Sequence, residues 1–161
     1  MMTDKNSFLP KLLGYMGLLP MIVPTILLFL DRNHSVIWSH WLITNAAIIL
    51  TFVGALHWAF AMTVNKLSEI ERRLAFIWSV IPALIAWVAL FMNTFYGSIL
   101  LAIFFILNLA RDKKIPKNAG LPVWYLPLRS KLTYTVTTCL LVAAIQENML
   151  MTSLIEVAPK H

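Results

Sequence analysis

Long apolar runs alternate with short polar stretches along this chain. A helix needs about 20 mostly apolar residues to cross the roughly 30 Å hydrocarbon core of a bilayer. Five runs approach that length, and they cover residues 12–30, 41–64, 74–92, 95–110 and 132–150. The last run is the weakest, because Gln146, Glu147 and Asn148 lie near its end. The pattern therefore predicts an all-α, polytopic membrane helical bundle of about five transmembrane helices, forming one domain over residues 1–161.

The composition supports a membrane protein. Apolar residues make up 60% of the chain and charged residues only 12%, with a mean hydropathy of +0.77. A soluble domain has roughly half apolar and a quarter charged residues, and could not hide so much apolar surface. The formal net charge is +6. In a membrane protein this excess points to topology and to anionic lipid head groups, so we expect lipids as partners and no nucleic acid.

The basic residues predict how the chain is oriented. Eleven of the 13 lysines and arginines lie before residue 12, within 65–73 or within 111–131. Cytoplasmic segments are the ones enriched in lysine and arginine. The amino terminus and the basic loop 111–131 are therefore predicted to be cytoplasmic, and five crossings leave the carboxyl terminus outside. In a mitochondrial protein the matrix would take the place of the cytoplasm.

Several residues inside the predicted spans need a physical reason. An ionisable side chain in a span is a functional-site hypothesis by default, and His57 is the only histidine in one. Its ordinary alternative is a neutral histidine bonded to a neighbouring helix. Small residues and prolines indicate close packing or kinks, and this set comprises Gly14, Gly17, Pro20, Pro24 and Pro82. The alternative for the first span is a broken helix that lines a binding site.

Loop 111–131 is the most distinctive polar segment. Its basic first half begins with Arg111-Asp112-Lys113-Lys114, which is expected to stop the fourth span. Its second half is apolar and aromatic, and two prolines there oppose a continuous helix. We expect this loop to lie on the cytoplasmic interface over anionic head groups, or to dock a partner protein.

Nothing in the sequence predicts a metal or cofactor. The single cysteine, Cys139, excludes an intrachain disulfide and a cysteine-based zinc site. It is expected to be a small packing residue. His34 and His40 suit no standard metal-binding spacing, and His57 alone cannot form a bis-histidine haem site.

Four segments in order carry a family resemblance: LGYMGLLP from residue 13, GALHW from residue 54, IPALIAW from residue 81 and GLPVWYLPLRSKLT from residue 120. Together they resemble the domain of unknown function 3429 family, which includes the animal transmembrane protein 69. The resemblance implies a small multi-span protein of bacterial inner membranes with mitochondrial relatives. It implies no activity and no catalytic residues.

The predicted topology places several of these residues at one depth. We expect them to converge on a ligand or partner site at the cytoplasmic leaflet, formed by Gly54, His57, Trp58, Asn108, Trp124, Tyr125 and Arg129. The preferred function is a non-enzymatic protein that supports envelope or membrane homeostasis or complex assembly.

Two other functions remain open. A small oligomeric transporter or channel would use the kinked spans and His57, although no carboxylate is expected to be buried in the first four spans. An intramembrane enzyme would need an acid beside His57 to orient it, and Asp112 is the candidate on the same side.

Overall fold

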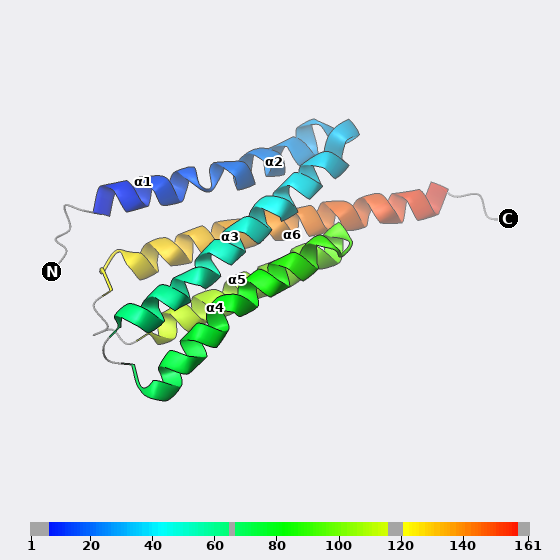
Figure 1. Ribbon diagram of the computed structural model, residues 1–161. Coiled ribbons are helices and arrows are strands. Elements are labelled where there is room, and N and C mark those ends of the chain that lie inside the picture. Colours follow the sequence, from blue (N-terminus) through cyan, green and yellow to red (C-terminus); the bar gives the residue numbers. More distant parts are fainter. Residues whose placement is uncertain (1–6, 65–66, 116–120, 158–161) are drawn as a thin grey trace.

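The computed structural model of the protein is a bundle of long helices and describes residues 7–64, 67–115 and 121–157 (Figure 1). In chain order these are α1 (Phe8–Met16), α2 (Leu19–Leu30), the short 3-10 helix η2 (Arg32–His34), α3 (Ser35–Thr63), α4 (Glu69–Leu90), α5 (Thr94–Lys114) and α6 (Tyr125–Val157). No strand occurs within these ranges. The predicted all-α class is confirmed.

Four helical segments of the described chain are long and apolar enough to cross a membrane. They are Phe8–Leu30, Arg32–Thr63, Glu69–Leu90 and Thr94–Lys114. They match the first four predicted spans. The fifth predicted span lies inside α6, which is longer than a bilayer requires but is diluted by threonines and by the polar residues at 146–148. A fifth crossing remains a prediction.

The helices extend further into the polar stretches than the sequence pattern indicates. Helix α5 continues through Arg111 to Lys114, and α6 begins at Tyr125, so the predicted loop 111–131 is largely helical at both ends. Pro127 fits α6 because it lies in the first turn. Backbone N–H groups there have no partner within the helix, so a proline costs little. This extension decides where Asp112 and Arg129 lie.

The first span is interrupted rather than gently kinked. Helix α1 ends at Met16, and α2 begins at Leu19 after a turn at Gly17 and Leu18. Pro20 lies in the first turn of α2, where its missing N–H is tolerated, and Pro24 lies within that helix. The turn separates α1 from α2, and α1 packs against α6.

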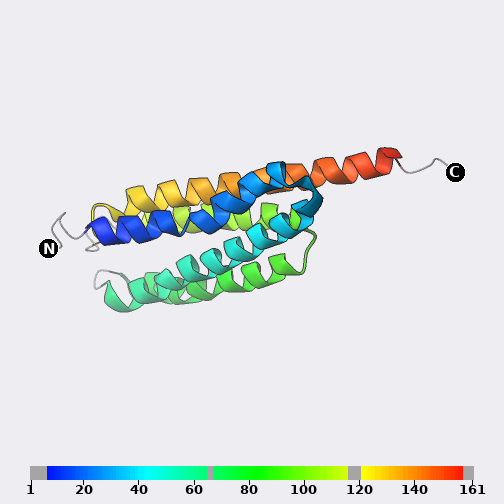
Figure 2. The same ribbon diagram turned by 90° about the horizontal axis from the view of Figure 1, so that it is seen from above.

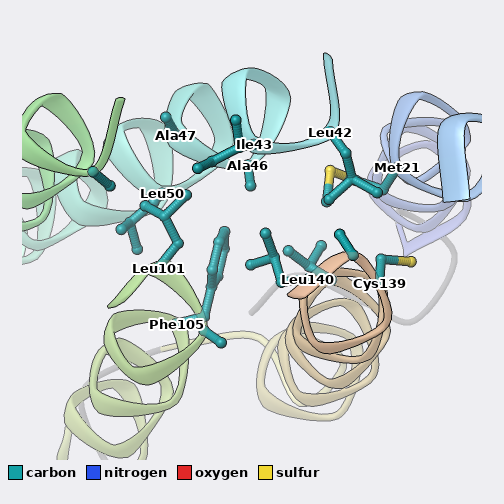
Figure 3. Close-up of a cluster of buried hydrophobic side chains, with 14 of the residues drawn as sticks. Met21, Leu42, Ile43, Ala46, Ala47, Leu50, Leu101, Phe105, Cys139 and Leu140 are labelled. Atoms are coloured by element: carbon teal, nitrogen blue, oxygen red, sulfur yellow. The ribbon is translucent and has the colours of Figure 1, made fainter. Parts of the chain in front are cut away.

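Helix α3 lies at the centre of the bundle and contacts α2, α4, α5 and α6. Its side chains Leu42, Ala46 and Leu50 are fully buried. They meet Met21 of α2, Leu101 and Phe105 of α5 and Leu140 of α6 in one apolar cluster, shown in Figure 3. Cys139 lies at the edge of this cluster as a buried free thiol, in agreement with its expected packing role. The outer faces carry many exposed apolar side chains, as expected for helices that lipid surrounds.

Two glycines allow the helices to approach closely. A Cβ atom on Gly54 of α3 would lie 2.7 Å from Cβ of Pro82 in α4. A Cβ atom on Gly97 of α5 would lie 2.6 Å from the carbonyl oxygen of Ala89 in α4. Gly54 and Pro82 are therefore packing residues at one α3–α4 contact, which is how small residues serve in membrane bundles.

The helix termini of the bundle are grouped at its two ends. The starts of α1, α4 and α6 and the ends of α3 and α5 lie at one end, and the α2–α3 and α4–α5 connections lie at the other (Figures 1 and 2). We call the first group the basic end, because it holds Lys11, Arg72, Arg111, Lys114 and Lys131. The sequence grouped these residues on one side, and the helix directions agree with that grouping.

The start of α4 offers a first testable prediction. Ser68 caps the helix, since its backbone N–H donates to Glu71 Oε2 at 2.8 Å while its Oγ accepts from the Glu71 N–H at 3.3 Å. We expect Ser68→Ala to lower the free energy of unfolding by about 1 kcal/mol, the usual value of such a cap. Unfolding in mixed detergent micelles measures it. Thr44→Ala removes a methyl group and a hydroxyl that is bonded to its own helix at His40 O, and is the control at a position inside a helix. An equal loss in both variants would contradict a capping role.

Candidate functional site

His57 faces the interior of the bundle near the basic end. It follows Leu50, Val53 and Gly54 on the buried stripe of α3, so helical periodicity turns it away from the lipid-exposed faces. Only 4% of its surface is exposed. Its ring meets Phe60 edge-on at a centroid distance of 5.9 Å.

A buried carboxylate lies opposite His57. Asp112 Oδ1 is 3.4 Å from His57 Nε2, and Asp112 is fully buried. It lies one turn after Asn108 on the stripe of α5 that also buries Leu101 and Phe105. The expectation that the first four spans bury no carboxylate is therefore wrong. The run Arg111–Lys114 resembles a solvated stop signal, but α5 continues through it and carries Asp112 inward.

Arg129 of α6 completes the site. Its Nε donates to Asp112 Oδ2 at 2.9 Å, and its Nη1 donates to the hydroxyl of Thr133, one turn along, at 2.8 Å. Both residues are buried. Asp112 thus lies between the imidazole of His57 on α3 and the guanidinium of Arg129 on α6. The negative charge of Asp112 and the positive charge of Arg129 neutralise each other. We call His57, Asn108, Asp112, Arg129 and Thr133 the polar cluster.

Several atoms of the polar cluster lack a hydrogen-bond partner within the described part of the chain. They are both ring nitrogens of His57, Asn108 Nδ2, Asp112 Oδ1 and Arg129 Nη2. The Tyr125 hydroxyl also interacts with the side chains of Asp112 and Arg129. A buried polar group without a partner is costly, and such groups are normally satisfied by protein or by ordered water. The cluster therefore has unused capacity to bind water or a polar group.

Tyr125 borders the cluster at the first turn of α6. Its ring packs edge-on against Phe60 at 5.8 Å, and its hydroxyl is buried. Burial, and then the negative charge of Asp112, raise the pKa of Tyr125. The phenol therefore stays neutral at physiological pH.

Asn108 and Arg111 connect the cluster to α4. Trp78 Nε1 donates to Asn108 Oδ1 at 2.9 Å. The guanidinium of Arg111 lies 4.8 Å from the centre of the Trp78 ring, in a cation–π contact. These contacts hold the end of α5 against α4 and so fix the position of Asp112.

The structure brings together only part of the predicted site. His57, Asn108, Tyr125 and Arg129 lie in or beside the polar cluster, whereas Gly54 packs on Pro82 one turn away. Trp58 lies elsewhere: its side chain is 49% exposed and packs on Phe76. Because Trp58 immediately follows His57 on a helix, it points about 100° away. Asp112 and Thr133 were missing from the predicted site, although Asn108 and Asp112 at i and i+4 continue the inward stripe of α5.

An apolar groove lies beside the cluster, between α1, α3 and α6. Its volume is about 490 Å³. Apart from Tyr125 and Arg129, its walls are apolar side chains and glycines. They include Leu13 and Gly14 of α1 with Gly17 after it, Phe52 and Leu56 of α3, and Leu128 and Leu132 of α6 with Trp124 before it. Gly14 leaves room here, since a Cβ atom would lie 3.1 Å from Leu132 Cδ1.

Two further cavities open nearby. The lysine pocket, of about 560 Å³, is lined by Lys11, Tyr15, Trp124, Leu128 and Lys131, so it shares Trp124 and Leu128 with the apolar groove. The His57 pocket, of about 180 Å³, is lined by His57 together with Glu71, Arg111 and Lys114 among others. The polar cluster therefore lies between the His57 pocket, which His57 lines, and the apolar groove, which Tyr125 and Arg129 line.

Comparison with known proteins gives one match. A family model described as "Protein of unknown function (DUF3429)" matches residues 7–145. No curated protein and no solved structure matches the chain. The resemblance inferred from the four sequence segments is confirmed.

Proposed function

Because the chain belongs to the DUF3429 family, whose description carries no activity, we propose a function from the geometry of its cavities. The protein is a small, non-enzymatic membrane protein that binds an anionic lipid at the cytoplasmic leaflet. Through this binding it supports membrane homeostasis or the assembly of a larger complex. The observation that supports this proposal is an apolar groove that shares two lining residues, Trp124 and Leu128, with a pocket that carries two lysines.

The apolar groove suits a hydrocarbon chain. Its volume of about 490 Å³ lies in the range of small-molecule sites, and its walls are mostly apolar. The interrupted first span forms one wall, since Leu13, Gly14 and Gly17 lie around the turn between α1 and α2. A broken helix beside a cavity is a common way to build a ligand site in a membrane protein.

The lysine pocket suits the head group of the same lipid. Lys11 and Lys131 come from α1 and α6, on two walls of one cavity. Lys11 Nζ donates to Ser7 Oγ at 3.0 Å, which leaves further N–H groups for a ligand. The aromatic side chains Tyr15 and Trp124 suit the boundary between head group and chain. Two positive charges beside an apolar groove are complementary to a phosphate on an acyl chain, so the occupant is an anionic phospholipid.

The direct test compares lipid binding to two charge-matched double variants. Each lysine near an anionic surface contributes about 1 kcal/mol, so Lys11→Gln with Lys131→Gln should weaken binding roughly tenfold or more. The probe is phosphatidylglycerol in nanodiscs otherwise made of phosphatidylcholine, and native mass spectrometry counts the lipids retained. The control, Arg73→Gln with Lys113→Gln, removes two exposed charges outside both cavities. Equal retention by both double variants would exclude a specific site at the lysine pocket.

A small oligomeric transporter or channel is the second candidate. The observation that favours it is the buried pair of His57 and Asp112, because intramembrane ionisable residues often mark ion or proton pathways. The lipid-binding function would be favoured if the wild-type protein retained phosphatidylglycerol and no other solute displaced it. Solute flux into proteoliposomes that is lost in Asp112→Asn would favour the second.

A further inference from the structure

We infer that His57 and Asp112 together form a buried proton-binding site that exchanges its proton with water in the His57 pocket. The ligand is the proton itself, held between two side chains from different helices. This inference does not depend on the lipid-binding proposal. It assigns a chemical role to a cluster that lipid binding does not explain.

The arrangement of charge around Asp112 favours a bound proton. One oxygen of Asp112 is occupied by Arg129, and the other, Oδ1, lies 3.4 Å from His57 Nε2 without a hydrogen bond. The Arg129–Asp112 pair is neutral as a unit, and a neutral His57 offers Oδ1 a donor only in the tautomer that carries its proton on Nε2. One proton taken up from water gives an N–H at both ring nitrogens, so that Nε2–H faces Oδ1 whichever tautomer was present. No covalent bond breaks and nothing is oxidised.

Polar atoms around the space between His57 and Asp112 also have unused hydrogen-bonding capacity. Asn108 Nδ2 and Arg129 Nη2 are both buried and without a partner in the described ranges, and both are donors. If the ion pair had only a structural role, we would expect the polar atoms around it to have hydrogen-bond partners, because a partly satisfied polar network is costly. Donors and an acceptor around one site are suited to internal water, which can carry a proton between His57 and Asp112.

Water can reach His57 through the His57 pocket. His57 is one of the residues that line the His57 pocket, which lies at the basic end of the bundle. The charged and titratable groups around the site come from four helices: His57 on α3, Glu71 on α4, Arg111, Asp112 and Lys114 on α5, and Tyr125 and Arg129 on α6. Arg111, Lys114 and Arg129 oppose a second positive charge, whereas Asp112 and Glu71 favour it. Proton binding therefore depends on charges of both signs, and the pair titrates as one unit.

The experiment is a titration of the full-length protein in lipid bilayers with ¹⁵N-labelled histidine, followed by NMR from about pH 2 to about pH 9, a range that extends well below that of an ordinary histidine because burial disfavours the charged ring. The NMR signals of His57 are identified as those that disappear from the spectrum of the His57→Gln variant. We expect His57 to change from neutral to protonated within this range. In Asp112→Asn the midpoint should fall by at least one pH unit, a tenfold loss of proton affinity, because the facing negative charge is gone.

A second variant keeps the test decisive if Asp112→Asn does not fold. Lys114 is exposed and lines the His57 pocket, so Lys114→Gln should fold normally and should raise the midpoint. Lys113→Gln, next to it and outside the pocket, is the control and should leave the midpoint unchanged. The proposal is overturned if His57 stays neutral throughout the titration. It is also overturned if the midpoint is the same in wild type and in every folded variant.

Discussion

Arg129→Ala is expected to lower the free energy of unfolding by about 3–5 kcal/mol, the usual cost of removing one partner of a buried ion pair. Arg129 is 5% exposed, and its Nε donates to the fully buried Asp112 at 2.9 Å. Alanine would leave the carboxylate without its cation and Thr133 without its donor. The loss is therefore much larger than a surface arginine would give.

Reversible unfolding in mixed micelles with increasing dodecyl sulfate measures this change. Arg73→Ala is the matched control, because Arg73 is exposed at the start of α4 and should change stability by no more than about 0.5 kcal/mol. The double replacement Asp112→Leu with Arg129→Met should recover a large part of the loss, since it removes both charges together. If Arg129→Ala and Arg73→Ala had the same free energy of unfolding, the Arg129–Asp112 ion pair would not contribute much to the stability of the fold.

Gly97→Ala is the second large expected effect. The added Cβ atom would lie 2.6 Å from the backbone carbonyl of Ala89 and 2.6 Å from Ile43 Cδ1. Ile43 can change its rotamer, but the carbonyl belongs to α4 and moves only if the α4–α5 hairpin opens. Overpacking of a tight interior typically costs about 1–3 kcal/mol, and this site should lie at the upper end of that range.

The control for Gly97→Ala is Gly17→Ala. A Cβ atom on Gly17 would meet only the carbonyl oxygens of Gly14 and Leu13, both at 3.4 Å, and the backbone at Gly17 is helical. The change should therefore be nearly neutral in the same unfolding assay. Equal destabilisation by both substitutions would mean that the loss of glycine flexibility matters, rather than the α4–α5 contact.

The candidate site was partly predictable. His57 is recognisable in sequence because it is an ionisable residue inside an apolar run, and Arg129 and Tyr125 because they lie in an unusual loop. Trp58 adjoins His57 in sequence but lies outside the polar cluster, because adjacent residues on a helix do not share a face. Asp112 was predicted only as the acid of the enzyme alternative and not as a site residue, because its neighbours Arg111, Lys113 and Lys114 made it look like part of a solvated charge run.

The sequence by itself determined the class of protein, the approximate helices and the grouping of basic residues at one end. These properties follow from local apolar length and local charge, which are read directly along the chain. Only the tertiary structure decided that Asp112 meets both His57 and Arg129, and that Lys11 and Lys131 line one pocket. Those contacts join different helices, and their geometry depends on how far α5 and α6 extend and on how the helices are rotated against one another, which no local pattern specifies.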